Sequence, residues 1–230
     1  MPTSLGTYSE NPQATWLIDP ATAADAPDRD MQLLRDFWFK DSDGTIWLAP
    51  AGSVVNGASI PAPLWSTVGS PYTGPYRRAS IVHDVACDAA EHATDPKSAR
   101  SAADKMFYQA CRAGGCSIAQ AELLYVGVRI GTWLPRIHLW NQPMQAALLA
   151  TNRTLPDVPE ESVRTTYREI AADLQARPGG RTFRQLETLV NRHLEAKAAQ
   201  HLSAMPKSLP SRTSNRRLNP KSKPHTKVQH

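Results

Sequence analysis

The sequence contains few cysteines, three in 230 residues, and they are Cys87, Cys111 and Cys116. An odd number without C-x-x-C or Cys/His zinc spacing argues against a disulfide framework and against a zinc finger. We expect reduced, buried and inert thiols. Residues 1–11 lack the basic and apolar regions of a signal peptide, and no stretch approaches the length of a membrane span. We therefore expect a chain that is cytoplasmic as synthesised, and virion association or delivery elsewhere stays open.

Aromatic residues are nearly absent after residue 140, where only Tyr167 and Phe183 occur among 16 in the chain. The packed core is therefore expected in the first 140 residues. Residues 203–230 hold seven Lys or Arg and no acid, whereas the other 202 residues hold 19 basic and 21 acidic residues. We predict four regions: an irregular N-terminal arm (1–30), a folded domain (31–141), a helical appendage (142–202) and a disordered basic tail (203–230).

The two ends of the chain have different expected partners. The arm would dock on the domain through Trp16, Leu17 and Ile18. The tail lacks the interleaved aromatics on which bases stack, so it carries no specific nucleic-acid motif, and we expect it to contact anionic surfaces nonspecifically. The sequence leaves the oligomeric state open.

The remaining chain predicts an α+β fold. An Asp-Gly turn at 41–44 between apolar runs predicts an antiparallel hairpin. Pro75 and a capping box at 117–120 mark helix starts, and we expect helices over 76–91, 98–113 and 117–131. Two further helices are expected over 159–177 and after Thr182. The fold class is therefore a short antiparallel β-hairpin or sheet packed on a three-helix core, followed by a helical hairpin and a disordered tail.

Two of these helices carry candidate catalytic residues. If helices 76–91 and 98–113 form an antiparallel hairpin, pairing His83 with Asp104 puts the midpoint near residue 93, inside the expected connection. Asp104 lies on an apolar face, where an unpaired charge is expensive. We predict a hydrogen bond in which Asp104 orients the imidazole and His83 acts as general base. A purely structural buried pair explains the same pattern.

Asp84 follows His83 and points about 100° away around the helix. It can face the loop 56–61, where Asn56, Gly57 and Ser59 are the candidate substrate or loop residues. A carboxylate facing backbone carbonyls suits calcium, so Asp84 is the candidate metal ligand. Asp84 is the only acid between residues 49 and 87, so we expect a weak site. In the alternative interpretation the loop is only a rigid turn.

Three short motifs occur in order: N-G-A-S-I-P at 56–61, A-x-x-x-H-D at 79–84 and A-D-x-x-F at 103–107. This order resembles DUF1353, a family found largely in phages and prophages, over roughly residues 33–131. The family has no settled activity. Asn56 stands where Asp is common in the family, and Val85, Ala86 and Cys87 stand where aromatic or Leu-Tyr residues are common.

The helix pair also resembles that of secreted and bacterial phospholipase A2. This resemblance implies that His83 activates water, Asp104 orients the imidazole and Asp84 binds calcium. The glycine-rich calcium loop of that family is absent here.

Two classes of function follow. The first is a hydrolase in which His83 and Asp104 activate water. Lipid esters are its leading candidate substrate, and cell-envelope material is the second. The second is a non-catalytic phage or prophage structural or accessory protein that uses the domain as an interaction module. A pocket at His83 would favour the hydrolase, whereas complete burial of His83 and Asp104 would favour the interaction module.

Truncation after Leu202 should leave the melting temperature nearly unchanged. Residues 203–230 contain no aromatic and few apolar groups, so they cannot bury enough surface to offset the entropy of ordering. Calorimetry on the full and truncated chains measures the difference. A large drop would mean that the tail docks on the domain.

Overall fold

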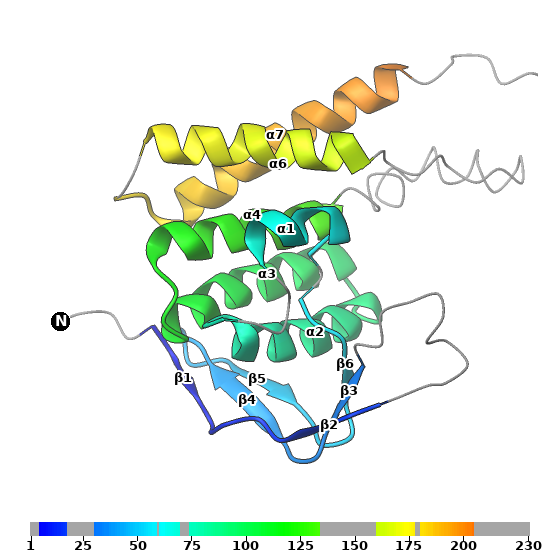
Figure 1. Ribbon diagram of the computed structural model, residues 1–230, viewed down its shortest axis with the longest axis vertical. Helices are drawn as coiled ribbons and strands as arrows, with labels where there is room; N and C mark the ends of the chain where they lie inside the picture. The colour runs from blue at the N-terminus through cyan, green and yellow to red at the C-terminus, as the bar shows by residue number, and fades with distance from the viewer. Residues whose placement is uncertain are drawn as a thin grey trace, which may run out of the picture.

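The computed structural model describes residues 5–17, 30–58, 60–69, 74–133, 160–177 and 180–204. Within them, six strands form two antiparallel three-stranded sheets and six α-helices pack on one side of the sheets (Figure 1). The α+β fold class predicted from the sequence is confirmed. The expected disordered tail and the closing segment after Trp133 lie largely outside the described residues.

The first sheet contains the predicted hairpin. Its strand order is β1 (Thr7–Tyr8), β4 (Phe37–Lys40) and β5 (Ile46–Ala49). Asp41 Oδ1 accepts hydrogen bonds from the backbone N–H groups of Asp43 (3.0 Å) and Thr45 (2.9 Å). These bonds shape the turn locally, because an Asp side chain can stand in for a backbone acceptor.

The second sheet uses part of the N-terminal arm. Its order is β2 (Ala14–Trp16), β3 (Met31–Leu33) and β6 (Val54–Val55). The arm expected to be irregular thus supplies β1 and β2. Trp16 is 56% exposed, so it does not dock by burial, and Ile18 lies outside the described residues. Strands of two or three residues are too short to show an alternating pattern, which explains why the sequence did not indicate them.

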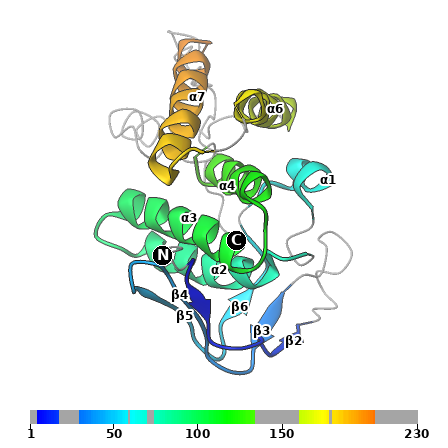
Figure 2. The same cartoon turned by 90° about the vertical axis from the view of Figure 1, so that its left-hand side faces the viewer.

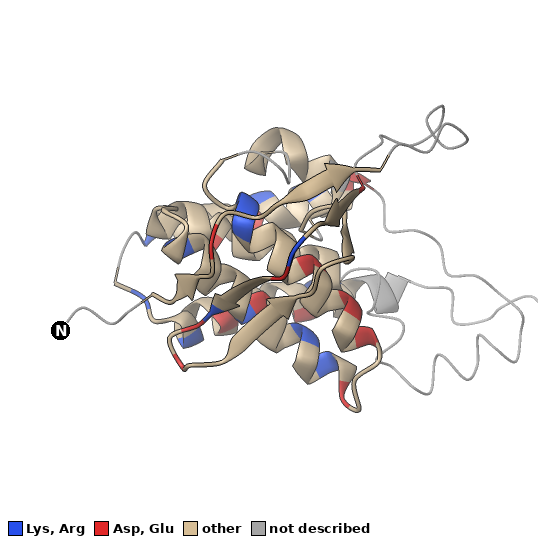
Figure 3. Cartoon of the chain, turned by 90° about the horizontal axis from the view of Figure 1, so that it is seen from below, with Lys and Arg blue, Asp and Glu red and all other residues tan. Residues whose placement is uncertain are grey.

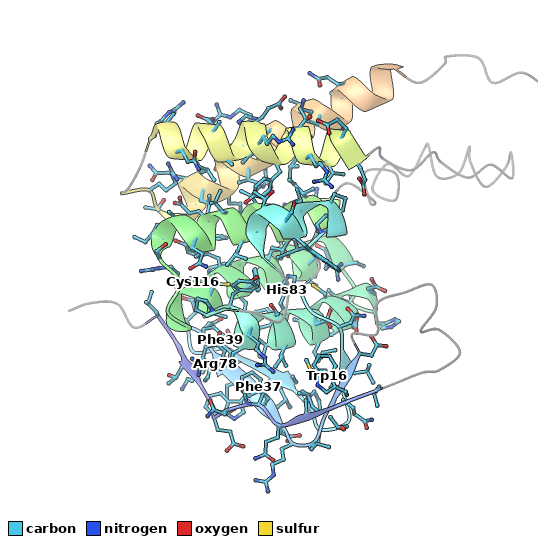
Figure 4. All side chains as sticks on the ribbon, in the orientation of Figure 1. Trp16, Phe37, Phe39, Arg78, His83 and Cys116 are labelled. Carbon is cyan, nitrogen blue, oxygen red and sulfur yellow. The ribbon has the colours of Figure 1, made fainter. Side chains whose placement is uncertain are left out.

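Tyr8 fastens the arm to the helices. Its hydroxyl donates to the backbone carbonyl of Ala110 (2.7 Å), and the Arg78 guanidinium lies 4.3 Å from the centre of its ring. The ring also stacks on Phe37 and packs at a tilt against Phe39, and both phenylalanines are buried between the sheet and the helices (Figure 4). Burial raises the pKa of Tyr8, so its hydroxyl stays protonated and keeps donating.

The three-helix core matches the expected segments closely. It consists of α2 (Arg77–Glu91), α3 (Pro96–Ala113) and α4 (Ile118–Trp133). Helix α3 begins two residues earlier than expected, because Asp95 caps it by accepting from the Ser98 N–H (3.1 Å) and Pro96 follows the cap. Two short helical pieces, η1 (Ala62–Leu64) and α1 (Trp65–Val68), lie in the stretch expected to be a loop.

The helical hairpin packs on α4. It consists of α6 (Glu160–Ala176) and α7 (Phe183–Ala204), and Thr182 with Gln185 forms the expected capping box before α7. Ile170 and Leu194 are 0% exposed and belong to the same buried cluster as the centre of α4. The hairpin expected as an appendage therefore shares one core with the domain.

Seen from two directions, the molecule is a stack of layers (Figures 1 and 2). The sheets lie at one end, α2 and α3 cover them, α4 follows, and α6 and α7 lie at the other end. Viewed from the sheet end, most of the strand surface carries no charged residue (Figure 3). Within the described residues, no helix combines the length and the apolar character that crossing a membrane requires.

Replacing Leu194 by Ala should lower the free energy of unfolding by about 2–5 kcal/mol, because it leaves a cavity where α7 meets the core. Denaturant unfolding should remain one transition, since the hairpin and the domain share a core. Glu195→Ala, at the exposed neighbouring position, is the control and should change little. Two separate transitions, with only one shifted by Leu194→Ala, would contradict a shared core.

Candidate functional site

His83 and Asp104 meet between α2 and α3. The antiparallel helices bring His83 Nε2 to 2.9 Å from Asp104 Oδ1, so the predicted hydrogen bond is confirmed. Both side chains are 0% exposed. His83 lies within the helical layers (Figure 4), and its ring packs on Phe107 with 4.8 Å between the ring centres.

Asp104 has a second charged partner that sequence reasoning missed. Arg129 Nη1, from α4, donates to Asp104 Oδ2 at 3.0 Å, and Thr132 Oγ1 lies 3.4 Å from Oδ1. Arg129 Nη2 also donates to Asn191 Oδ1 on α7 at 2.7 Å. The carboxylate is therefore the centre of a buried polar network that joins α2, α3, α4 and α7.

A signal for Arg129 does exist in the sequence. It is the single charged residue between Leu123 and Trp133, in an otherwise apolar helix. A buried guanidinium needs an acceptor, and Asp104, on the apolar face of the preceding helix, is the carboxylate that could supply one. Asn191 could not have been found this way, because nothing in the sequence places α7 beside the end of α4.

The protonation of His83 follows from these neighbours. Burial alone would lower the pKa of His83, but Cys87 and the hydrogen bond to Asp104 outweigh it and raise the pKa to about 10. Cys87 Sγ lies 3.4 Å from Nε2 and 3.7 Å from Nδ1, one helical turn along α2. The imidazole therefore carries a proton on both nitrogens at neutral pH.

Asp84 faces the loop 56–61, as its position on the helix predicts. Its Oδ2 accepts from the backbone N–H groups of Asn56 (2.7 Å) and Gly57 (3.3 Å). The loop thus presents donors to the carboxylate rather than carbonyl oxygens. Gly57 has φ +105°, which a residue with a Cβ adopts only with strain. Ser59 lies outside the described residues.

The environment of Asp84 also raises its pKa. Burial is the main cause and brings the pKa to about 6, although the Asn56 N–H and the nearby His83 act in the opposite direction. The geometry makes Asp84 an anchor for the loop. Its role as a calcium ligand stays a prediction.

One group of metal-ligating side chains occurs within the described part of the chain. It consists of His83, Cys87 and Asp104, whose ligand atoms all lie within 4.8 Å of one another. A nitrogen, a thiolate and a carboxylate suit zinc better than calcium. Arg129, 3.0 Å from Asp104, already neutralises the carboxylate and would oppose a cation beside it. Asp84 is not part of this group.

Residues 31–128 match the family described as "Protein of unknown function (DUF1353)". The resemblance to DUF1353 is therefore confirmed for this segment, which contains the β4–β5 hairpin and His83, Asp84 and Asp104. The segment ends one residue before Arg129.

Two curated relatives are similar to the chain. The uncharacterized protein y4jT of Sinorhizobium fredii (strain NBRC 101917 / NGR234) is 35% identical over 127 residues, 54% of this chain. The uncharacterized protein y4iH of the same strain is 34% identical over 96 residues, 42% of this chain. The matches span 33% and 38% of these relatives, about a third of their length. No solved structure matches the chain significantly.

Replacing His83 by Gln should remove a pH dependence of stability. The folded-state pKa of His83 lies above its ordinary value of 6.5, so protonation stabilises the fold. This contribution is complete below about pH 6.5 and is lost as pH rises toward 10, at about 1.4 kcal/mol for each pKa unit. The stability difference between wild type and His83→Gln should therefore shrink across that range.

Urea unfolding at one-unit intervals from pH 6 to 10 measures this difference. His92→Gln, at an exposed position after α2, is the control and should track the wild type at every pH. A difference for His83→Gln that stays constant with pH would contradict a charged imidazole in the fold.

Proposed function

We propose that this chain is a non-catalytic interaction module whose His83–Asp104–Arg129 network is structural. The observation that carries the proposal is the complete burial of His83 and Asp104. A general base must touch both a water molecule and a substrate. The His83 side chain is 0% exposed, so neither bulk water nor a substrate reaches the imidazole in this arrangement.

The charge of the imidazole supports the same interpretation. A general base has to accept a proton, and the raised pKa of His83 means that the ring already holds one at neutral pH. In a water-activating pair the carboxylate stabilises an imidazolium that forms during the reaction. Here Cys87 and the hydrogen bond to Asp104 raise the pKa of His83 against the effect of burial, and so keep the proton on the ring.

The loop beside Asp84 supports it as well. Calcium requires several oxygen ligands, yet the Asn56 and Gly57 N–H groups point at the Asp84 carboxylate. An anchored rigid turn, which is the alternative interpretation of the loop, accounts for this geometry without a cation.

The strands provide a surface suited to contact. Among the described residues, Lys40 is the only charged residue in the six strands, and several large apolar side chains are exposed there or directly beside them: Trp16, Leu34, Ile46, Leu48 and Val54. Exposed apolar residues that gather on one layer are typical of interaction surfaces. A role as a phage or prophage structural or accessory protein rests on the family resemblance alone.

The lipid-ester hydrolase stays the alternative. It is favoured by the 2.9 Å bond between His83 Nε2 and Asp104, which is the geometry a water-activating pair needs. It requires the residues around His83 to open, so that Nδ1 can reach water and an ester.

The wild-type protein should release no product from a fluorogenic phospholipid ester above the rate in buffer, with or without millimolar calcium. Calorimetric titration should show no calcium binding at millimolar levels to wild type or to Asp84→Asn. His83→Ala should lower the melting temperature, because it removes the imidazole that bonds Asp104 Oδ1 and leaves a cavity in the buried network.

Calcium-dependent hydrolysis by the wild type would overturn the proposal if His83→Ala abolishes it. Leu124→Ala serves as the control, since Leu124 is fully buried in α4 and its truncation also destabilises the fold. Activity retained in Leu124→Ala but lost in His83→Ala would make His83 catalytic.

A further inference from the structure

A cavity of about 710 Å³ lies at the turn between α6 and α7, outside the site described above. Four arginines line it: Arg177, Arg181, Arg184 and Arg192. No acidic residue lines it among the described residues. Its volume lies within the range of small-molecule binding sites, roughly 300–1,000 Å³.

The arginines differ in what they already bind. Arg181 Nη1 donates to Glu122 Oε2 (2.6 Å), and Arg181 Nη2 donates to the Leu174 carbonyl (2.9 Å). Arg181 therefore has a structural role, because it links α6, α4 and the start of α7. Arg177 pairs with Asp173 at 3.2 Å. These two carboxylates therefore balance two of the four guanidinium groups.

The remaining two, Arg184 and Arg192, are exposed and form no ion pair with any described residue. Asp173 is already held by His193 at 3.2 Å and by Arg177, and these contacts, with a smaller effect of the Arg192 charge, keep the pKa of Asp173 below its usual value. Arg184 and Arg192 are therefore the two arginines at the cavity that no carboxylate of the described residues pairs with in an ion pair.

We infer that this cavity binds a soluble anion carrying phosphate groups. Arg184, Thr188 and Arg192 follow one another along one side of α7 and all line the cavity, so two planar donor groups are available there. The Thr188 hydroxyl already donates to the Arg184 carbonyl at 2.8 Å. Guanidinium groups bind phosphate oxygens in pairs, through charge-assisted hydrogen bonds. Among the described residues, no aromatic side chain lines the cavity, so this lining offers no stacking platform for a base and favours recognition of the phosphate groups.

The site lies outside the segment that matches DUF1353, since α7 begins at Phe183. It is also remote from His83, Asp104 and Asp84 in the sequence and uses none of them. The inference goes beyond the proposed function, and it can fail while that proposal stands.

Isothermal titration of the full chain with inorganic pyrophosphate tests the inference. We expect binding by the wild type that weakens as sodium chloride is raised, because screening reduces the attraction. The double variant Arg184→Gln/Arg192→Gln should bind about tenfold more weakly or worse. The matched control Arg35→Gln/Arg77→Gln removes the same charge at exposed positions elsewhere and should bind as the wild type does.

Three results would overturn the inference. These are no binding of pyrophosphate by the wild type, equal weakening in both double variants, and binding only to phosphatidate vesicles. Melting temperatures of the two double variants show whether lost binding reflects unfolding. Arg184→Lys/Arg192→Lys keeps the charge without the planar donor pair, and affinity intermediate between wild type and the Gln variant would support guanidinium recognition.

Discussion

The rest of this structure depends on one carboxylate without access to water. Asp104 is fully buried, and an unpaired charge in that position would be expensive. His83 and Arg129 compensate it from two other helices, and Asn191 takes the far end of the Arg129 guanidinium from a fourth. The positions of α2, α4 and α7 around α3 are therefore specified by polar contacts as well as by apolar packing, because each helix must bring its partner within hydrogen-bond distance.

A second buried contact complements the first. Arg181 and Glu122 join the start of α7 to α4 at 2.6 Å, while Asn191 and Arg129 join the two helices further along. Two contacts at different points fix both the position of α7 and its rotation about its own axis. That rotation decides which side of α7 faces the core, and it leaves Arg184 and Arg192 directed away from it.

Local signals in the sequence predicted local structure well. The Asp-Gly turn, the capping boxes at Ser117 and Thr182, and the register of α2 against α3 were all readable, because each depends on residues that are near in sequence or on one helix pair. The short strands β1 and β2 were not, since their pairing is set by partners elsewhere in the chain.

The candidate site was only half predictable for a related reason. The His83–Asp104 pair follows from helix geometry, but Asn191 reaches the network through tertiary packing over a long sequence separation. The motifs also do not indicate whether a His-Asp pair is exposed, because exposure depends on the layers packed around it. Here both side chains are buried, and the role we propose for them is therefore structural and not catalytic.

The three free thiols, Cys87, Cys111 and Cys116, are all buried. Cys87 touches His83 at the centre of the polar network, whereas Cys111 and Cys116 flank the turn between α3 and α4. A thiol-reactive dye can therefore modify this protein only when a layer separates from its neighbour. Cys87 reports on separation of the helices around the polar network, and Cys111 and Cys116 report on separation near the turn between α3 and α4. The order in which the three cysteines react would show which helices separate first.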